Sequence, residues 1–401
     1  MDTSERIREG ESLGAGPIVF IVTHPMTARF LLLDQLLYLQ REGFDVRVMT
    51  APGADLEVVR EAGIPVSTMP LQREIRPLAD LRALAALRRE LKAVAPRVVN
   101  AGTPKAGLLG MLAARSLAVP HRLYTLRGLR LETTSGLKGR ILAAGERLAA
   151  HSAQRVICVS HSLRRKAVEL GLVSPHKAVV LGEGSSRGVD LDRFSGSTEE
   201  ADEATAKVRD RLGVPPGTPV IGFVGRFVED KGIEDLLAAF FEVVLPAAGE
   251  ARLLLVGDFE PGDPVSERAR RRIESDPRVL RPGFVGDAAP YYRLMTALAF
   301  PSYREGFPNV PLEAAAAGLP VVGYAATGTV DAVVDGETGI LVPPSATAAL
   351  GEALLAMIQQ PARAHRLGAA GRARAAKHFD HRIVRRRWAE EYRRLLAGDE
   401  A

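Results

Sequence analysis

Two short apolar stretches, PIVFIV at residues 17–22 and PVIGFV at residues 219–224, decide the fold of this 401-residue chain. Each begins at a proline and is followed by a loop and then by a long stretch with helical periodicity. A short apolar run that leads into an amphipathic helix is typical of a strand buried in a parallel sheet. The sequence therefore predicts two related domains, each of which opens on a strand and a helix.

The same alternation of apolar runs and helical periodicity continues along the chain, which predicts an α/β fold with parallel sheets. The strands expected in the first half are 17–22, 44–50, 97–100, 122–125, 155–159 and 178–181. The helices expected there are 29–42, 78–94, 105–117 and 137–152. This set of elements predicts one doubly wound, Rossmann-like domain.

A polar stretch, SGSTEEADEAT at residues 195–205, separates the two halves. Its small and acidic residues cannot bury apolar surface, so the linker between the domains is expected there. The predicted organisation is a tail at 1–16, a first domain at 17–195 and a second domain at 206–382. An amphipathic helix at 383–398 is expected to return and pack on the first domain. Ligands are expected in the cleft between the carboxyl edges of the two sheets.

Composition and charge argue against several classes of protein. The net charge of +5 is spread along the chain, without the arginine-rich tract of a nucleic-acid groove. Cys158 is the single cysteine, so one chain cannot form a disulfide or a thiolate metal cluster. The apolar run at 18–22 is too short for a signal peptide or a membrane span. We therefore expect a cytoplasmic protein.

The segment GRFVEDKG at residues 225–232 follows the strand at 219–224 and leads into a helix. This position places Gly225, Arg226 and Lys231 at the carboxyl edge of the second sheet, where two cations can clamp a diphosphate. The alternative is that Arg226 only forms a surface ion pair with Glu229 or Asp230.

The segment PSYREGFPNVPLE at residues 301–313 runs from the end of a strand through a loop into a helix. A helix that begins near Asn309 and Val310 offers free backbone N–H groups and a positive dipole end to a phosphate, without a metal. Glu313, one turn inside the helix, can accept hydrogen bonds from both ribose hydroxyls. Glu305 would then face the sugar of the donor. In one alternative, Glu305 is a solvated loop acid and Glu313 is an acid near the helix N-terminus that complements the helix dipole. In another, the two carboxylates act as the acid and base of a glycosidase.

The second half resembles the group-1, family-4 retaining glycosyltransferases of the GT-B fold, in which two Rossmann-like domains face each other across a cleft. The resemblance rests on Gly225-Arg226 with Lys231, on Glu305 and Glu313, on GLPVV at 318–322, and on DGETGILVP at 335–343. The first half is similar to a bacterial subgroup that acts on lipid-linked saccharides, through REIRP at 73–77, GTPKAG at 102–107, YTLRG at 124–128 and LGEGSSRGVD at 181–190.

The resemblance implies roles for individual residues. Arg226 and Lys231 are expected to bind the diphosphate, Glu313 the ribose and Glu305 the donor sugar, with Arg226, Lys231 and Glu305 as the catalytic set. The other donor-binding residues implied are Gly225, Gly306, Phe307, Asn309, Val310, Phe284 near the base, and Arg127. No metal and no resident cofactor are expected, because a nucleoside-diphosphate sugar, UDP-linked in our prediction, is the co-substrate.

The first half departs from the family pattern at two positions. Many relatives carry a pair of glycines after the first strand, where this chain has THPMT at 23–27. Relatives often carry histidine where this chain has Arg127, which cannot act as a titrating base. Arg127 is expected either to contact a donor or acceptor phosphate or to pair with Glu132. His24 is at a strand end in the cleft and is assigned either ligand contact or a structural role.

The predicted activity is retaining transfer of a hexosyl group to a saccharide or a polyprenyl-linked acceptor, by front-face substitution. The alternatives are a natural-product glycosyltransferase, a silent sugar-nucleotide-binding subunit and a sugar-nucleotide epimerase. Leucines and arginines in 81–92 and 137–155 are compatible with peripheral contact at the inner face of a membrane. The ordinary explanation for them is amphipathic helices that pack on their own sheet and turn a basic face to solvent.

Overall fold

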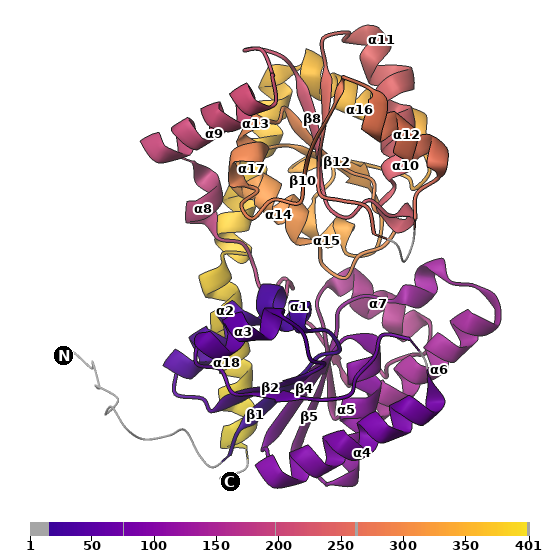
Figure 1. Cartoon of the computed structure of the whole chain (residues 1–401), viewed down its shortest axis with the longest axis vertical. Helices are drawn as coiled ribbons and strands as arrows, with labels where there is room; N and C mark the ends of the chain where they lie inside the picture. Colours follow the sequence, from indigo (N-terminus) through magenta and orange to yellow (C-terminus); the bar gives the residue numbers. More distant parts are fainter. Residues whose placement is uncertain (1–15, 75, 197, 261–263, 399–401) are drawn as a thin grey trace.

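The computed structural model describes residues 16–74, 76–196, 198–260 and 264–398. It contains two domains, each a parallel sheet covered by helices on both faces, as Figure 1 shows. The predicted tail at 1–16 lies outside the described residues except for its last position. The fold is the predicted α/β fold with two Rossmann-like domains.

The first sheet has seven parallel strands in the order β3-β2-β1-β4-β5-β6-β7. Its strands are β1 (Ile18–Ile21), β2 (Val46–Thr50), β3 (Val66–Thr68), β4 (Val98–Gly102), β5 (His121–Leu126), β6 (Arg155–Cys158) and β7 (Ala178–Val179). The α-helices between them are α1 (Pro25–Thr27), α2 (Leu33–Arg41), α3 (Asp55–Glu61), α4 (Pro77–Val94), α5 (Pro104–Ser116), α6 (Gly136–Ser152) and α7 (His161–Glu169). A π-helical turn, η1 (Ala28–Leu32), joins α1 to α2, and a 3₁₀ turn, η2 (Arg130–Thr133), precedes α6.

The second sheet has six parallel strands in the order β10-β9-β8-β11-β12-β13. Its strands are β8 (Val220–Val224), β9 (Arg252–Val256), β10 (Val279–Gly283), β11 (Ala297–Phe300), β12 (Val321–Tyr324) and β13 (Gly339–Val342). The surrounding helices and turns are α8 (Leu191–Ser195), α9 (Glu199–Arg211), η3 (Glu229–Lys231), α10 (Ile233–Ala239), η4 (Phe240–Val244), α11 (Leu245–Ala247), α12 (Glu267–Ser275), α13 (Ala289–Leu294), α14 (Asn309–Ala316), α15 (Thr329–Ala332), α16 (Thr347–Gln359) and α17 (Pro361–His378).

The strand order places β1 and β8 at equivalent positions. All residues of β1 are buried, as expected for a strand with helices on both faces. Ile18 pairs with Val46 of β2 on one side and with Val98 of β4 on the other. The strand order reverses between β1 and β4 in one domain and between β8 and β11 in the other. Crevices at such reversals, outside the carboxyl ends of the strands, are where open α/β sheets bind ligands.

The last helix, α18 (His381–Ala397), belongs to the first domain, although the second domain precedes it in the chain. Trp388 and Tyr392 of α18 are buried with Phe20 and other first-sheet residues in one apolar cluster. The Tyr392 hydroxyl also accepts a hydrogen bond from the Asn100 side chain at 2.7 Å. The chain crosses back where Val189 and Asp380 form a parallel bridge.

The structure corrects the prediction of a linker at 195–205, because much of this stretch is helical. Helix α9 begins at Glu199 within it and packs on α13. Thr198 caps this helix through the backbone N–H of Ala201, and three acidic residues in the first turn complement the helix dipole. Val208 supplies the buried side chain further along the same helix.

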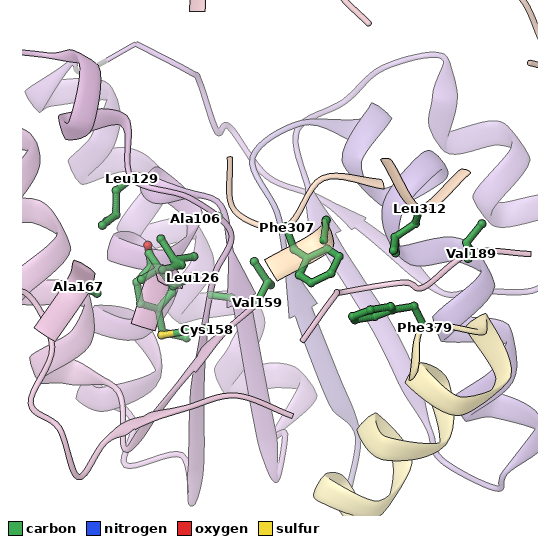
Figure 2. Packing of buried hydrophobic residues seen from close by; sticks show 14 of the residues in the cluster. Ala106, Leu126, Leu129, Cys158, Val159, Ala167, Val189, Phe307, Leu312 and Phe379 are labelled. Carbon is green, nitrogen blue, oxygen red and sulfur yellow. The ribbon is translucent and has the colours of Figure 1, made fainter. Parts of the chain in front are cut away.

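An apolar cluster continues from the first domain into the second. Figure 2 shows the ring of Phe307, from the loop before α14, directed toward Phe379 at the end of α17. Their ring centroids are 5.0 Å apart, and Val189 and Leu312 lie beside them. The two domains are therefore packed against each other near the point where the chain crosses.

Candidate active site

The candidate site lies at the reversal of strand order in the second sheet. Gly225 and Arg226 follow β8, and the loop at 301–308 follows the neighbouring strand β11 and leads into α14. Gly232, with φ of +66°, caps the turn η3; a Cβ there would lie 2.1 Å from the Pro301 carbonyl oxygen. This close approach brings η3 and the loop at 301–308 together.

A cavity of about 310 Å³ lies between these segments. It is lined by Arg187, Phe223, Val224, Gly225, Arg226, Lys231, Phe300, Ser302, Glu305, Pro308, Asn309, Val310 and Glu313. The structure thus brings together seven of the predicted site residues, which come from two separate stretches of sequence. Among the lining side chains are three cations and two carboxylates, and the N-terminus of α14 forms part of the wall.

Lys231 and Glu305 form an ion pair inside the cavity, with Nζ and Oε1 2.5 Å apart. Both side chains are largely buried. The Ser302 hydroxyl donates a second hydrogen bond to the same carboxylate oxygen at 2.9 Å. Glu305 is therefore held in one orientation by two partners, and its charge is balanced within the site.

Glu313 is also fixed by two partners. Its Oε1 accepts from the Arg187 guanidinium at 2.8 Å, and its Oε2 accepts from the Tyr292 hydroxyl at 2.8 Å. Burial, with the nearby Glu313 charge, raises the pKa of Tyr292 well above its usual value, so this hydroxyl acts as a hydrogen-bond donor. The Glu313 side chain is 12% exposed.

Arg226 does not pair with Glu229 or Asp230, which was the alternative raised from the sequence. Its guanidinium contacts Glu260 instead, and Glu260 also accepts from Arg73 of the first domain at 3.2 Å. Asp230 is paired with another residue, Arg304, at 2.5 Å. Although burial acts to raise it, the hydrogen bond from Arg226 lowers the pKa of Glu260 overall.

Arg127 directly follows β5 in the first domain. Its Nε and Nη1 atoms are buried and have no hydrogen-bond partner among the described residues. Burial lowers the pKa of Arg127 to about 10. It does not pair with Glu132, whose carboxylate accepts from Thr327 of the second domain at 2.7 Å. A Cβ on Gly306 would lie 2.1 Å from the Arg127 carbonyl oxygen, so this glycine lets the two backbones meet.

Three other predicted residues lie outside the cavity lining. Phe307 is buried in the apolar cluster between the domains, where it packs on Phe379. Phe284, after β10, is 77% exposed. His24 is exposed and caps α1, with Nδ1 accepting from the Met26 backbone N–H at 3.3 Å. The structure therefore gives His24 a local structural contact.

Sequence reasoning assigned no role to Arg187, Tyr292 or Ser302. Arg187 lies within the quoted stretch at 181–190, but nothing local indicates that its side chain reaches α14. Tyr292 is on α13, where an aromatic residue reads as ordinary core. Ser302 lies three residues before Glu305 in the segment at 301–313, so of these three residues it alone could have been expected at the site from the sequence.

Among the described residues, no group of three or more His, Cys, Asp or Glu side chains is arranged to hold a metal ion. None of the helices in the described ranges is long and apolar enough to cross a bilayer.

Two family models match the chain. Residues 32–184 match the glycosyl transferase 4-like domain, and residues 218–360 match the glycosyl transferases group 1. The capsular polysaccharide biosynthesis glycosyltransferase CapM of Staphylococcus aureus is 33% identical over 361 residues, which span 90% of this chain and 92% of that protein. An Escherichia coli UDP-Gal:alpha-D-GlcNAc-diphosphoundecaprenol alpha-1,3-galactosyltransferase is 25% identical, with 72% of this chain and 74% of that protein covered.

Solved structures agree on the fold. Anabaena HepE, in complex with UDP and glucose, superposes with a TM-score of 0.77 over 94% of this chain and 99% of that one, at 22% identity. Sucrose-phosphate synthase from Thermosynechococcus elongatus superposes with a TM-score of 0.79 at 22% identity, over 96% of this chain and all of that one. The domain order, the cavity at the second sheet and the family matches agree, and the chain belongs to the group-1, family-4 glycosyltransferases of the GT-B fold.

Proposed function

We propose that this glycosyltransferase moves a hexosyl group from a UDP-sugar to a saccharide or lipid-linked acceptor, with retention at the anomeric carbon. The observation that carries the proposal is the cavity lined by Arg226, Lys231, Glu305 and Glu313 with the N-terminus of α14. Cations and free N–H groups suit a diphosphate, and carboxylates suit sugar hydroxyls. The E. coli relative has a UDP-sugar in its name, and the name of CapM places it in capsular polysaccharide synthesis.

Each end of the donor has its own partners in this proposal. Arg226, Lys231 and the α14 N-terminus at Asn309 and Val310 hold the diphosphate, and Glu313 holds the ribose. Glu305 binds the sugar, while Phe284 is available to the base. The diphosphate competes with Glu305 for Lys231 and with Glu260 for Arg226, so binding exchanges existing ion pairs for new ones.

The test is a calorimetric screen of UDP, GDP, dTDP and their glucose conjugates, without added metal. The screen is repeated with Glu313→Ala and Lys231→Ala. We expect UDP to bind most tightly and both variants to weaken it on the order of tenfold or more. Glu274→Ala and Lys207→Ala, which change exposed residues outside the cavity, are the matched controls. Equal binding by wild type and both site variants would contradict the proposal.

The acceptor is assigned to the first domain. Arg127 is a buried cation with no carboxylate partner in the part of the chain that the structure describes, so an anionic group of the acceptor or the donor would satisfy it. If the enzyme transfers to a diphosphate-linked lipid and not to a neutral saccharide, this would favour a contact between Arg127 and the acceptor. Consumption of the donor without any acceptor would favour the alternative of an epimerase.

Retention is proposed through front-face substitution. The anomeric C–O bond to the diphosphate breaks and the acceptor oxygen bonds to the same face of the carbon, while its proton passes to a donor phosphate oxygen. Arg226, Lys231 and the helix N-terminus stabilise the charge on the departing diphosphate. NMR of the product should show the anomeric configuration of the donor; an inverted product or an isolated glycosyl-enzyme would remove this mechanism.

Contact with the inner face of a membrane is proposed for the side formed by α4 and α6, which both pack on α5. Leu78 of α4 and Leu137 of α6 are 76% and 73% exposed, and exposed arginines and lysines lie beside them. Apolar side chains with basic neighbours suit an anionic lipid surface.

Flotation with phosphatidylglycerol vesicles tests this contact. We expect the wild type to float and Leu137→Ser with Ile141→Ser to stay in solution, whereas Leu170→Ser, an exposed leucine at the end of α7, floats like wild type. Flotation that ignores the α6 changes, or no flotation at all, would contradict it.

A further inference from the structure

The segment that connects the two domains carries an arginine into the donor cavity. Arg187 lies in a turn where the Gly188 N–H donates to Ser185 Oγ at 3.0 Å. Gly188 has φ of +68°, and a Cβ there would lie 2.6 Å from the Phe379 carbonyl oxygen. The backbone that carries Arg187 is therefore packed closely against the start of α18.

The Arg187 guanidinium contacts both domains. One terminal nitrogen donates to the Phe30 carbonyl of the first domain at 3.5 Å, and the other donates to Glu313 of the second at 2.8 Å. Its Nε is buried without a hydrogen-bond partner among the described residues. The full set of contacts exists only where Phe30 of η1 and Glu313 of α14 are both within reach of this one guanidinium.

These contacts leave Glu313 able to bind a ribose. Each carboxylate oxygen accepts about two hydrogen bonds. Arg187 takes one position on Oε1 and Tyr292 takes one on Oε2, which leaves one position on each oxygen for the two ribose hydroxyls. Arg187 also balances a negative charge that would otherwise repel the diphosphate in a largely buried site.

We propose that Arg187 is a positioning residue for the donor nucleotide: it presents the Glu313 carboxylate to the ribose from the connecting segment, while it also contacts Phe30 of the first domain. The inference rests on the proposed function, because it takes Glu313 as the ribose ligand. Nucleotide affinity then depends on the domains being together, since a ligand that binds better to one arrangement shifts the protein toward it.

A double-mutant cycle with UDP tests the proposal. The proteins are wild type, Arg187→Met, Glu313→Gln, the double variant, and Arg187→Lys, which keeps the charge. Arg193→Met is the matched control, because Arg193 also forms a 2.8 Å ion pair, with Asp287, but both side chains are exposed and outside the donor cavity. Thermal unfolding of each variant reports whether it is folded.

We expect Arg187→Met to raise the Kd for UDP and the KM for the donor on the order of tenfold, with kcat changed less than about threefold. The double variant should bind no more weakly than Glu313→Gln alone, because both changes remove one interaction. Arg187→Lys should recover part of the affinity, and Arg193→Met should match wild type. If Arg187→Met does not fold, Arg187→Lys and its double with Glu313→Gln carry the same comparison.

Two results would overturn the inference and leave the donor site in place. One is wild-type affinity in Arg187→Met when Glu313→Gln binds weakly. The other is a double variant in which the two losses multiply, which would mean that Arg187 acts independently of Glu313. Wild-type affinity in Glu313→Gln, or no nucleotide binding by the wild type, would instead remove the proposed ribose site itself.

Discussion

The charged residues of the cavity are paired in advance. Lys231 is bound to Glu305, and Arg187 is bound to Glu313, so the site holds its charges without a ligand. Such pairing fixes each side chain before binding and limits the desolvation cost of each charge. Single substitutions therefore have two effects, because they remove one group and release its partner.

Glu305→Gln separates these effects. The amide keeps the shape of the side chain but removes the ion pair with Lys231, which is then free for the diphosphate. We expect UDP, which has no sugar, to bind as tightly as to wild type or more tightly, while kcat/KM falls about 100-fold. Calorimetry and initial rates on the same samples measure both. Weakened UDP binding would place Glu305 with the nucleotide and not with the sugar.

A second residue-scale prediction concerns pH. Burial raises the pKa of Glu146 in α6 to about 7, although the Tyr124 hydroxyl donates to it at 2.6 Å. The folded state then holds this proton more tightly than the unfolded chain, whose glutamate has a pKa of about 4.3. The contribution of Glu146 to stability is thus present below about pH 4.3 and declines as pH rises through about 7.

Glu146→Gln should remove that decline. We expect its Tm to rise relative to that of wild type as pH goes from about 5 to about 8, because the amide carries no charge to bury. Glu57→Gln, an exposed change on α3, should follow the wild-type profile. Parallel profiles for wild type and Glu146→Gln would contradict the assignment.

The sequence predicted the residues of the site better than their partners. Arg226, Lys231, Glu305 and Glu313 were expected from short motifs, and all four line one cavity. Their roles stay predictions until nucleotide binding is measured. Arg187 comes from the connecting segment, and no local pattern states which helix a long side chain will reach.

At the scale of elements, the strands and helices given bounds in the first half were predicted to within a few residues, because their periodicity is strong. Strand β3 was missed because it has three residues at the edge of the sheet, none of them buried. Helix α9 was taken for a linker because its composition is polar, although glutamate and alanine favour helices and Thr198 caps this one. Helix propensity and capping residues indicate a helix, whereas apolar residues indicate burial. The prediction for this stretch considered only the apolar residues.

Helix α18 provides the prediction at this scale. Trp388 is 2% exposed and stacks on Tyr392, with ring centroids 6.0 Å apart, beneath the first sheet. Trp388→Ala should cost about 3–5 kcal/mol of unfolding free energy. The indole Nε1 has no hydrogen-bond partner among the described residues, so Trp388→Phe loses packing only and should cost clearly less. Urea unfolding measures the loss of unfolding free energy in both variants. Equal losses in Trp388→Ala and Trp388→Phe would mean that the amount of packing removed does not determine the loss.

In the whole molecule, the two domains meet through polar contacts beside the cleft. Asp331 of the second domain accepts from the backbone N–H groups of His161 and Ser162 at 2.9 and 3.1 Å, at the N-terminus of α7. Arg304 of the second domain also donates to the Thr133 hydroxyl of the first domain at 2.8 Å. These bonds span the cleft and can break without unfolding either sheet.

Asp331→Ala should therefore loosen the closed arrangement. We expect a larger radius of gyration in small-angle X-ray scattering, with a Tm within a few degrees of wild type. The Asp335 carboxylate accepts from the Leu341 backbone N–H at 2.8 Å within the second domain, so Asp335→Ala should leave the radius of gyration unchanged. An unchanged radius in Asp331→Ala would mean that other contacts hold the domains together.

The return of α18 to the first sheet has a consequence for biosynthesis. A ribosome releases the chain from the N-terminus, so residues 17–189 emerge long before Trp388 and Tyr392, which complete their core. The nascent first domain must wait, with the face of its sheet uncovered, while the second domain is made and folds. Genetic truncation should show the same dependence: a fragment that stops before Asp380 would leave the first domain unfinished, whereas fusing residues 380–398 directly to 17–189 would restore it.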